Sequence, residues 1–315
     1  MTATRARARN AIVGFAVGIA LIAAAGWVLV GQADSLSKAR AAAADAPWWL
    51  VAAMLLTPVA NAAVVAWSFQ IIMNRFGRVP FGDMAALIGS AWLLNYLPMR
   101  PGLVGRLAYH KAVHKVSFRN SIAVSVALAL MTGLAAGHLL AVWLAFLAHT
   151  GLGIAVTVVS IGLVLLAANI AADRSPAGAV PRGALRLALV LRYADLAIWA
   201  VRFVIAFEIV GEPIPFLVGL MLAAAVQLAY LFPLTGAGLG VVEWAVAFVA
   251  PLAVPIDPAT AIAAALVNRA AELAAAVPVG LLSGTAIAKR RKKLGLRDPS
   301  GHSQAVPPDS VPPAP

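Results

Sequence analysis

The chain has 315 residues, of which 62% are hydrophobic and only 11% are charged, and its mean hydropathy is +0.91. This apolar content far exceeds what a water-soluble domain needs for its core, so the composition predicts an all-α, polytopic membrane protein and excludes an ordinary soluble one. The net charge of +12 does not argue for a nucleic-acid partner, because the basic residues of a membrane chain first report the orientation of its loops.

Apolar runs of membrane-spanning length recur along the chain. A hydrocarbon core of about 30 Å takes about 20 helical residues, and six full spans are predicted, at 11–31, 48–73, 120–148, 152–171, 194–210 and 259–287. The first is too long for a signal peptide, so we expect an uncleaved anchor. Residues 1–10 then form a basic cytosolic N-terminus, residues 11–288 the transmembrane domain, and residues 289–315 a basic, then proline-rich, disordered cytosolic tail.

Two further apolar runs are broken by proline and glycine. The first, 81–97, leads into the stretch "NYLPMRPGLVGR" at 95–106, and the second, 215–254, contains "FPLTGAGLG" at 232–240. Irregular backbone at membrane depth is tolerated only where protein or water satisfies its polar groups. We therefore expect two re-entrant or broken hairpins, each of which enters and leaves the membrane on one side.

The basic residues indicate how these segments are oriented. Most of the 24 lysines and arginines precede the first span, lie between the second and third, or follow the fourth and the last. Positive loops stay inside, so both termini are predicted to be cytoplasmic, in the cell (inner) membrane. Span, hairpin and span then follow one another twice in opposite orientations, joined through 152–171. Such an inverted repeat is typical of transporters.

The first broken stretch carries two arginines directly beside its prolines and glycines, Arg100 and Arg106. An arginine at the bilayer centre costs about 2.5–3.5 kcal/mol on insertion scales, so we expect both side chains at a wet or interfacial opening. Guanidinium groups and the free backbone NH groups of a broken helix suit a phosphate. The alternative is that both arginines only anchor a helix end on the cytosolic side.

The second broken stretch is followed by a carboxylate, Glu243, in an otherwise apolar segment. A buried carboxylate carries a proton or forms an ion pair, here with Arg269 or Arg202. Arg269 also has Glu272 one helical turn away, and these two could satisfy only each other. The fifth span holds further charges that line a pathway or pair among themselves: Asp195, Arg202 and Glu208.

Residues 106–119 predict an amphipathic helix that lies against anionic lipid headgroups at the cytosolic face. Its polar side would hold Arg106, His110, Lys111, His114 and Lys115. The two histidines have a spacing that can bind zinc, but no glutamate accompanies them and lysines surround them. We therefore expect no metal.

Both broken stretches resemble motifs of one family. "NYLPMRPGLVGR" resembles N-x-L-P-x-R-x-G-x-x-x-R of the lysylphosphatidylglycerol synthase transmembrane region family, also called the flippase-like family, with these residues in register: Asn95, Pro98, Arg100, Gly102 and Arg106. The second stretch resembles the family's P-x-T-x-G-G-x-G-x-x-E, and a later match adds an arginine: Pro233, Thr235, Gly238, Gly240, Glu243 and Arg269. The sequence departs from the pattern at Leu103, where the family often has an acid, and at Ala237.

The resemblance implies a lipid translocase that moves or binds a phospholipid or a polyprenyl- or glycolipid-type amphiphile across the cytoplasmic membrane, with the matched residues as its substrate-binding set. We expect no cofactor and no enzymatic activity, because the chain has neither a P-loop nor a recognisable nucleophile or metal set. The alternative is a non-catalytic accessory or scaffold subunit of a membrane glycosyltransferase or of another lipid- or glycan-modifying enzyme.

Overall fold

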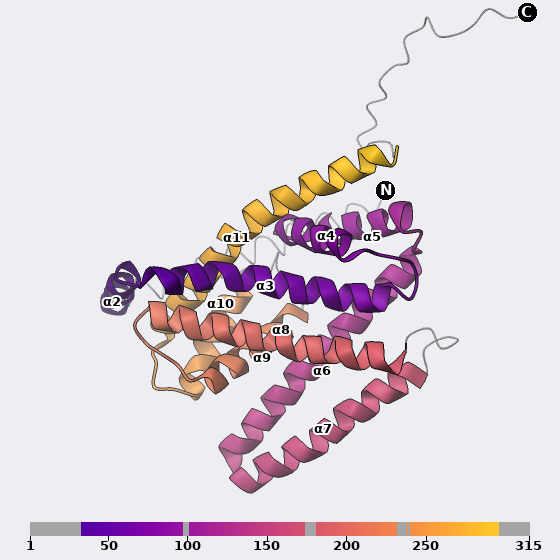
Figure 1. Ribbon diagram of the computed structural model, residues 1–315. Coiled ribbons are helices and arrows are strands. Elements are labelled where there is room, and N and C mark those ends of the chain that lie inside the picture. Colours follow the sequence, from indigo (N-terminus) through magenta and orange to yellow (C-terminus); the bar gives the residue numbers. More distant parts are fainter. Residues whose placement is uncertain (1–32, 97–100, 174–180, 232–237, 239, 296–315) are drawn as a thin grey trace, which may run out of the picture.

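The computed structural model describes residues 33–96, 101–173, 181–231, 238 and 240–295. Over these residues the chain forms ten α-helices, numbered α2 to α11, and one 3-10 helix (Figure 1). The first of them, α2, is Ala33–Ala44. The predicted first span at 11–31, the N-terminus 1–10 and the tail after residue 295 lie outside the described residues, so those predictions stay open.

Four helices are long and apolar enough to cross a membrane: α3 (Trp48–Met73), α6 (Phe118–Ala148), α7 (Thr150–Asp173) and α11 (Pro258–Lys293). Each coincides with a predicted span to within a few residues at its start. Large apolar side chains cover their outer surfaces, among them Leu130, Val158 and Leu282, which are each about two thirds or more exposed. These helices indicate a multi-pass membrane protein.

The predicted span at 194–210 is wrong at its beginning, because helix α8 runs from Arg182 to Ile209. We interpreted the arginines at 182–192 as a loop, since charges disfavour a lipid-facing helix. In the structure α8 is a central helix, and its Arg192, Asp195 and Arg202 are buried inside the protein. These three charges therefore face protein partners, whereas Arg182 and Arg186 at the beginning of α8 are exposed.

Both predicted interruptions are present as pairs of short helices. Helix α4 (Phe81–Leu94) is followed by α5 (Pro101–Val113), and α9 (Phe216–Leu231) is followed by α10 (Val241–Val249) and the 3-10 helix η3 (Ala250–Leu252). The two helices of each pair contact one another. Gly238 and Gly240 have φ values of +67° and +78°, a left-handed conformation that side chains other than glycine disfavour.

Helices α3 to α6, the first part of the chain, and helices α8 to α11, the second part, pack in the same way. Helices α3 and α8 lie side by side at the centre (Figure 1). In the first part α3 packs on α4, α4 on α11, and α5 on α6. In the second part α8 packs on α9, α9 on α6, and α10 on α11. Each broken helix pair is therefore held against the last long helix of the other part.

The predicted amphipathic surface helix at 106–119 is wrong, because α5 packs with part of its polar side in the protein interior. Its buried side holds Arg106, Tyr109 and His110, whereas Leu103 and Val104 are exposed. The predicted sides are therefore mixed: Arg106 and His110 turn inward, whereas Lys111 and Lys115 of the predicted polar side stay exposed. The physical reason is that the interior offers polar partners to α5, as described below.

Close packing of α4 and α5 depends on Gly102. A methyl carbon added there would lie 2.5 Å from the carbonyl oxygen of Ala91 and 2.8 Å from Oδ1 of Asn95, far inside van der Waals contact. Gly105, one turn further along α5, has no atom within 4 Å of such a carbon. Gly102 therefore acts as a spacer that lets the two helices meet.

We expect Gly102→Ala to destabilise the protein by about 1–3 kcal/mol, the usual cost of overpacking. The matched variant Gly105→Ala should be neutral or stabilise by about 0.5–1 kcal/mol, because alanine is the better helix former. Thermal unfolding of both variants in detergent measures the difference. Equal unfolding temperatures for the two variants would contradict the close contact of α4 and α5.

Candidate functional site

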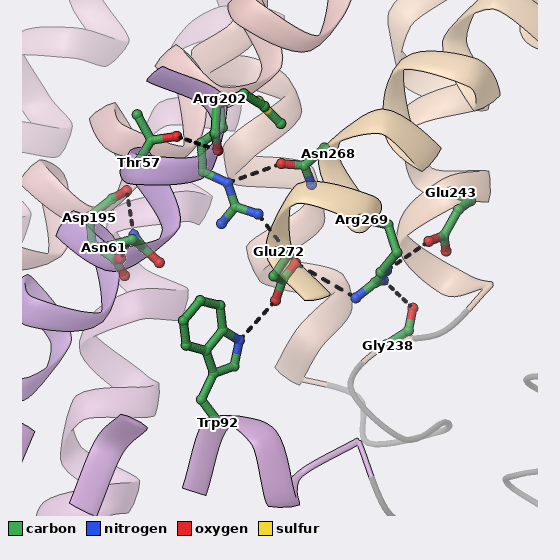
Figure 2. Close-up of polar contacts among 11 residues, drawn as sticks. Thr57, Asn61, Trp92, Asp195, Arg202, Gly238, Glu243, Asn268, Arg269 and Glu272 are labelled. Carbon is green, nitrogen blue, oxygen red and sulfur yellow. Dashed lines mark hydrogen bonds and ion pairs between the residues drawn. The ribbon is translucent and has the colours of Figure 1, made fainter. Parts of the chain in front are cut away.

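Three polar residues of α11 lie on its buried side: Asn268, Arg269 and Glu272. The helix around them is rich in alanine, so neighbouring helices approach closely and bring their own side chains within reach. Figure 2 shows that partners come from α8, α4 and α10. Buried charges in a membrane protein need such partners, because an unpaired charge there carries a large desolvation cost.

Glu272 is the meeting point of this network. One carboxylate oxygen, Oε2, accepts from Nη2 of Arg202 at 3.2 Å and lies 3.7 Å from Nη1 of Arg269; the other, Oε1, accepts from the indole NH of Trp92 at 3.3 Å (Figure 2). Arg202 also donates from Nε to Oδ1 of Asn268 at 3.0 Å, and its guanidinium stacks on Trp199 at 3.9 Å. Glu272 thus joins the end of α4 to α8 and α11.

Arg269 joins the second interruption to the same network. Its Nε donates to Oε1 of Glu243 at 3.0 Å, and its Nη2 donates to the carbonyl oxygen of Gly238 at 3.3 Å (Figure 2). The predicted pairing of Glu243 with Arg269 is confirmed, and so is the contact between Arg269 and Glu272. Arg269 and Glu272 therefore do not satisfy only each other, because Arg269 also pairs with Glu243 and Glu272 also pairs with Arg202.

A second polar group joins α3 to α8. The side-chain amide of Asn61 donates to the carboxylate of Asp195, which also accepts from Nη1 of Arg192 at 3.2 Å. Arg192 donates in addition to the hydroxyl of Ser68. Asp195 and Arg202, both in the predicted fifth span, therefore serve different ion pairs and do not pair with each other.

Two adjoining cavities lie between these networks, with volumes of about 230 and about 330 Å³. They share part of their lining: Asn61, Val65, Trp92, Asn95 and Glu272. The smaller also reaches Arg106 and Leu103, and the larger reaches Gln227 and Tyr230. Oδ1 of Asn95 is buried without a hydrogen-bond donor in the described residues. The cavities are thus polar at their common wall.

Arg106 differs from the other buried arginines of the described chain. Arg192, Arg202 and Arg269 each pair with a carboxylate. Arg106 donates from Nη2 to the hydroxyl of Ser125 at 3.0 Å, and its guanidinium lies 4.0 Å from the centre of the Phe69 ring. No carboxylate among the described residues pairs with it. A guanidinium has the geometry to hydrogen-bond a carboxylate or a phosphate.

The predicted site residues fall into two groups that the network brings near one shared space. Asn95 and Arg106 line the smaller cavity, with Gly102 as the spacer behind Asn95. The other group, Gly238, Glu243 and Arg269, reaches the cavity wall through Glu272, and Gly240 precedes α10. Four predicted residues lie outside the described part of the chain: Pro98, Arg100, Pro233 and Thr235.

Several site residues escaped the sequence analysis. Asn61, Trp92 and Ser125 gave no motif, and we made no prediction for them. The available signal was that a polar amide, such as that of Asn61, lay in the middle of a predicted span, where it needs an internal partner. Trp92 and Ser125 gave no comparable signal, because tryptophan and serine are tolerated in apolar helices.

No protein-family model matches the chain, and a search of curated proteins finds no match. The resemblance to the flippase-like family therefore stays a prediction that rests on two short motifs.

The role of Glu272 as the meeting point predicts a large effect of its neutralisation. Glu272→Gln would leave Arg202 buried without its carboxylate, and breaking a buried pair costs about 3–5 kcal/mol. Glu208→Gln, which removes an exposed carboxylate of α8, should change stability by less than about 0.5 kcal/mol. Thermal unfolding of the two variants beside the unmodified protein measures this. A Glu272→Gln variant as stable as Glu208→Gln would contradict the network.

Proposed function

We propose that this protein is an integral membrane lipid translocase, which binds the anionic headgroup of a phospholipid or a polyprenyl- or glycolipid-type amphiphile and moves it across the cytoplasmic membrane. The observation that carries the proposal is Arg106, a buried guanidinium that lines a cavity and pairs with no carboxylate of the described chain. The sequence motifs support the same function. Three further features of the molecule add to it.

The packing scheme supports two re-entrant hairpins in an inverted repeat, with α3, α6, α7, α8 and α11 as five of the six full spans that we predict. Helices α3 to α6 correspond in order to α8 to α11, with α7 as the connection, and each contact named above in one half has its counterpart in the other. Because α7 is one further crossing, the halves would enter the membrane in opposite orientations. Transporters of this type bind substrate where broken helices meet near the midplane.

The correspondence of the halves also accounts for Arg106, which pairs with no carboxylate among the described residues. Helix α5 corresponds to α10, and α6 to α11. Arg106 bound by Ser125 therefore takes the place that Glu243 bound by Arg269 has in the second half. The second half is closed by an internal ion pair, whereas the first half leaves its cation for an external anion. A phosphate group would complete it, with hydrogen bonds that a charge strengthens.

A lipid would reach this site laterally, from the bilayer. Leu103 lines the smaller cavity and is 40% exposed on the outer surface of α5, so the cavity extends to the surface that faces acyl chains. Its volume of about 230 Å³ holds a headgroup, while the chains stay in the bilayer. Movement of one helix pair relative to the α3 and α8 centre would then expose the headgroup to either side.

This proposal predicts that Arg106→Gln moves lipid poorly in a fluorescent-lipid assay with reconstituted liposomes. Loss of a charged hydrogen-bond partner costs about 1.5–3 kcal/mol, which corresponds to about a 10- to 100-fold slower transfer at low lipid concentration. The control is Arg186→Gln, which removes an exposed arginine bound only to Asn169 among the described residues and should transfer lipid at the unmodified rate.

Equal transfer by Arg106→Gln and the unmodified protein would contradict the site. If the unmodified protein binds anionic lipid through Arg106 but transfers none above empty liposomes, the translocase proposal is wrong, and the accessory-subunit alternative takes its place.

A further inference from the structure

The beginning of α4 lies beside the C-terminal half of α11 (Figure 1). A further polar cluster, separate from the two networks above, joins these two helices to α5. Oδ1 of Asp83 pairs with Nη1 of Arg290 at 2.6 Å, and Oδ2 lies 3.0 Å from Nε2 of His114. Nδ1 of His114 in turn lies 3.1 Å from Nδ1 of His110. The four side chains therefore form one continuous row from α11 through α4 to α5.

The row runs from an open space into the protein interior. The Arg290 side chain is 46% exposed, those of Asp83 and His114 are 7% and 3% exposed, and His110 is fully buried. Asp83 and Arg290 line a cavity of about 660 Å³ together with Lys289 and Lys293. These lysines belong to the basic end of α11, which the sequence places on the cytosolic side.

For two neutral imidazoles beside an ionised carboxylate, these contacts allow one arrangement of protons. With Asp83 ionised, Nε2 of His114 carries a hydrogen and donates to the carboxylate. Nδ1 of a neutral His114 is then an acceptor, so His110 donates from its own Nδ1. Nε2 of His110 is left with a free lone pair, and this atom is buried without a hydrogen-bond partner in the described residues. The row thus ends in a buried group that can accept a proton.

We propose that His110, His114 and Asp83 form a proton relay between the interior beside α5 and the cytosolic cavity. A proton that binds Nε2 of His110 allows its Nδ1 proton to pass to Nδ1 of His114. His114 then passes its Nε2 proton to Oδ2 of Asp83, from which water in the cavity removes it. One proton enters at His110 and one leaves at Asp83, and both imidazoles then hold the opposite tautomer. Transfers in the reverse order carry a proton from the cavity through Asp83 and His114, release one from Nε2 of His110, and restore the starting state. Arg290 pairs with the other carboxylate oxygen of Asp83, Oδ1, and leaves Oδ2 to His114.

The charged and polar groups near this row come from four helices. Arg106 lies one helical turn away on the same buried side of α5, and Tyr109 is adjacent. Helix α4 contributes Asp83, and α11 contributes Arg290 and Arg291. Helix α6 contributes the uncharged Ser121 and Ser125 to its own buried side. Asp83 is the one carboxylate among these groups.

A proton on His110 would also affect anion binding at Arg106. Protonated His110 would place a second positive charge near Arg106, so that proton uptake and anion binding strengthen each other by linkage. This coupling rests on the proposed function, whereas the relay itself does not.

The relay is tested by nitrogen NMR of protein labelled at its five histidines, with assignment by substitution. We expect Nδ1–H on His110 and Nε2–H on His114 at neutral pH, and a joint titration of the two rings. His114→Gln keeps a donor to Asp83 but cannot relay, so it should remove the joint titration of His110. His138→Gln, which alters a histidine bound to Tyr193, should leave it unchanged.

An Nε2–H tautomer of His110, or a titration of His110 that is the same in His114→Gln, would overturn the relay. The coupling is tested separately in the lipid assay, where His110→Asn should lose the dependence of transfer on cytosolic-side pH. Transfer with an unchanged pH profile would overturn the coupling and leave lipid movement standing. Absence of any transfer by the unmodified protein would overturn the proposed function, while the NMR result still decides the relay.

Discussion

A guanidinium that leaves water for the interior of a membrane protein must meet a counter-charge, and this constraint organises the whole molecule. Arg269 meets two carboxylates and the backbone of Gly238, while Glu272 gathers Arg202 and Trp92. Helix α11 therefore holds both interrupted helix pairs through one turn of its length. Such pairs contribute little net stability but are costly to break, so they specify how the helices meet.

Hydropathy alone could predict the lipid-facing part of this architecture. The predicted span 48–73 agrees with α3 residue for residue, because uncharged apolar sequence of that length has one stable arrangement in a bilayer. Proline and glycine likewise predicted both interruptions, since their backbone limits act locally. The beginning of α8 was predicted wrongly, because it depends on side-chain contacts and not on local backbone limits. Arg192 is buried within this helix and is held by Asp195 and Ser68, and the contact with Ser68 of α3 is one that no local pattern reveals.

The site could be predicted only in part. Glu243 and Arg269 stood out as charges in apolar sequence, so their pairing could be expected. The orientation of α5 could not, because it depends on Ser125 and Phe69, which receive Arg106 from other helices. Asn61 and Trp92 complete the cavity wall by the same kind of distant contact. Polar partners in a bundle are set by tertiary packing, and a single sequence records only that partners are needed.

The central proposal is that Arg106, which has no counter-charge among the residues that the structure describes, receives one from a bound lipid headgroup. An experimentally determined structure in nanodiscs of anionic phospholipid tests it most directly. We predict density of phosphate size within hydrogen-bonding distance of the Arg106 guanidinium, with attached chain density leaving past Leu103. A guanidinium paired instead with a carboxylate of the chain itself, above a cavity filled by apolar side chains, would contradict the account.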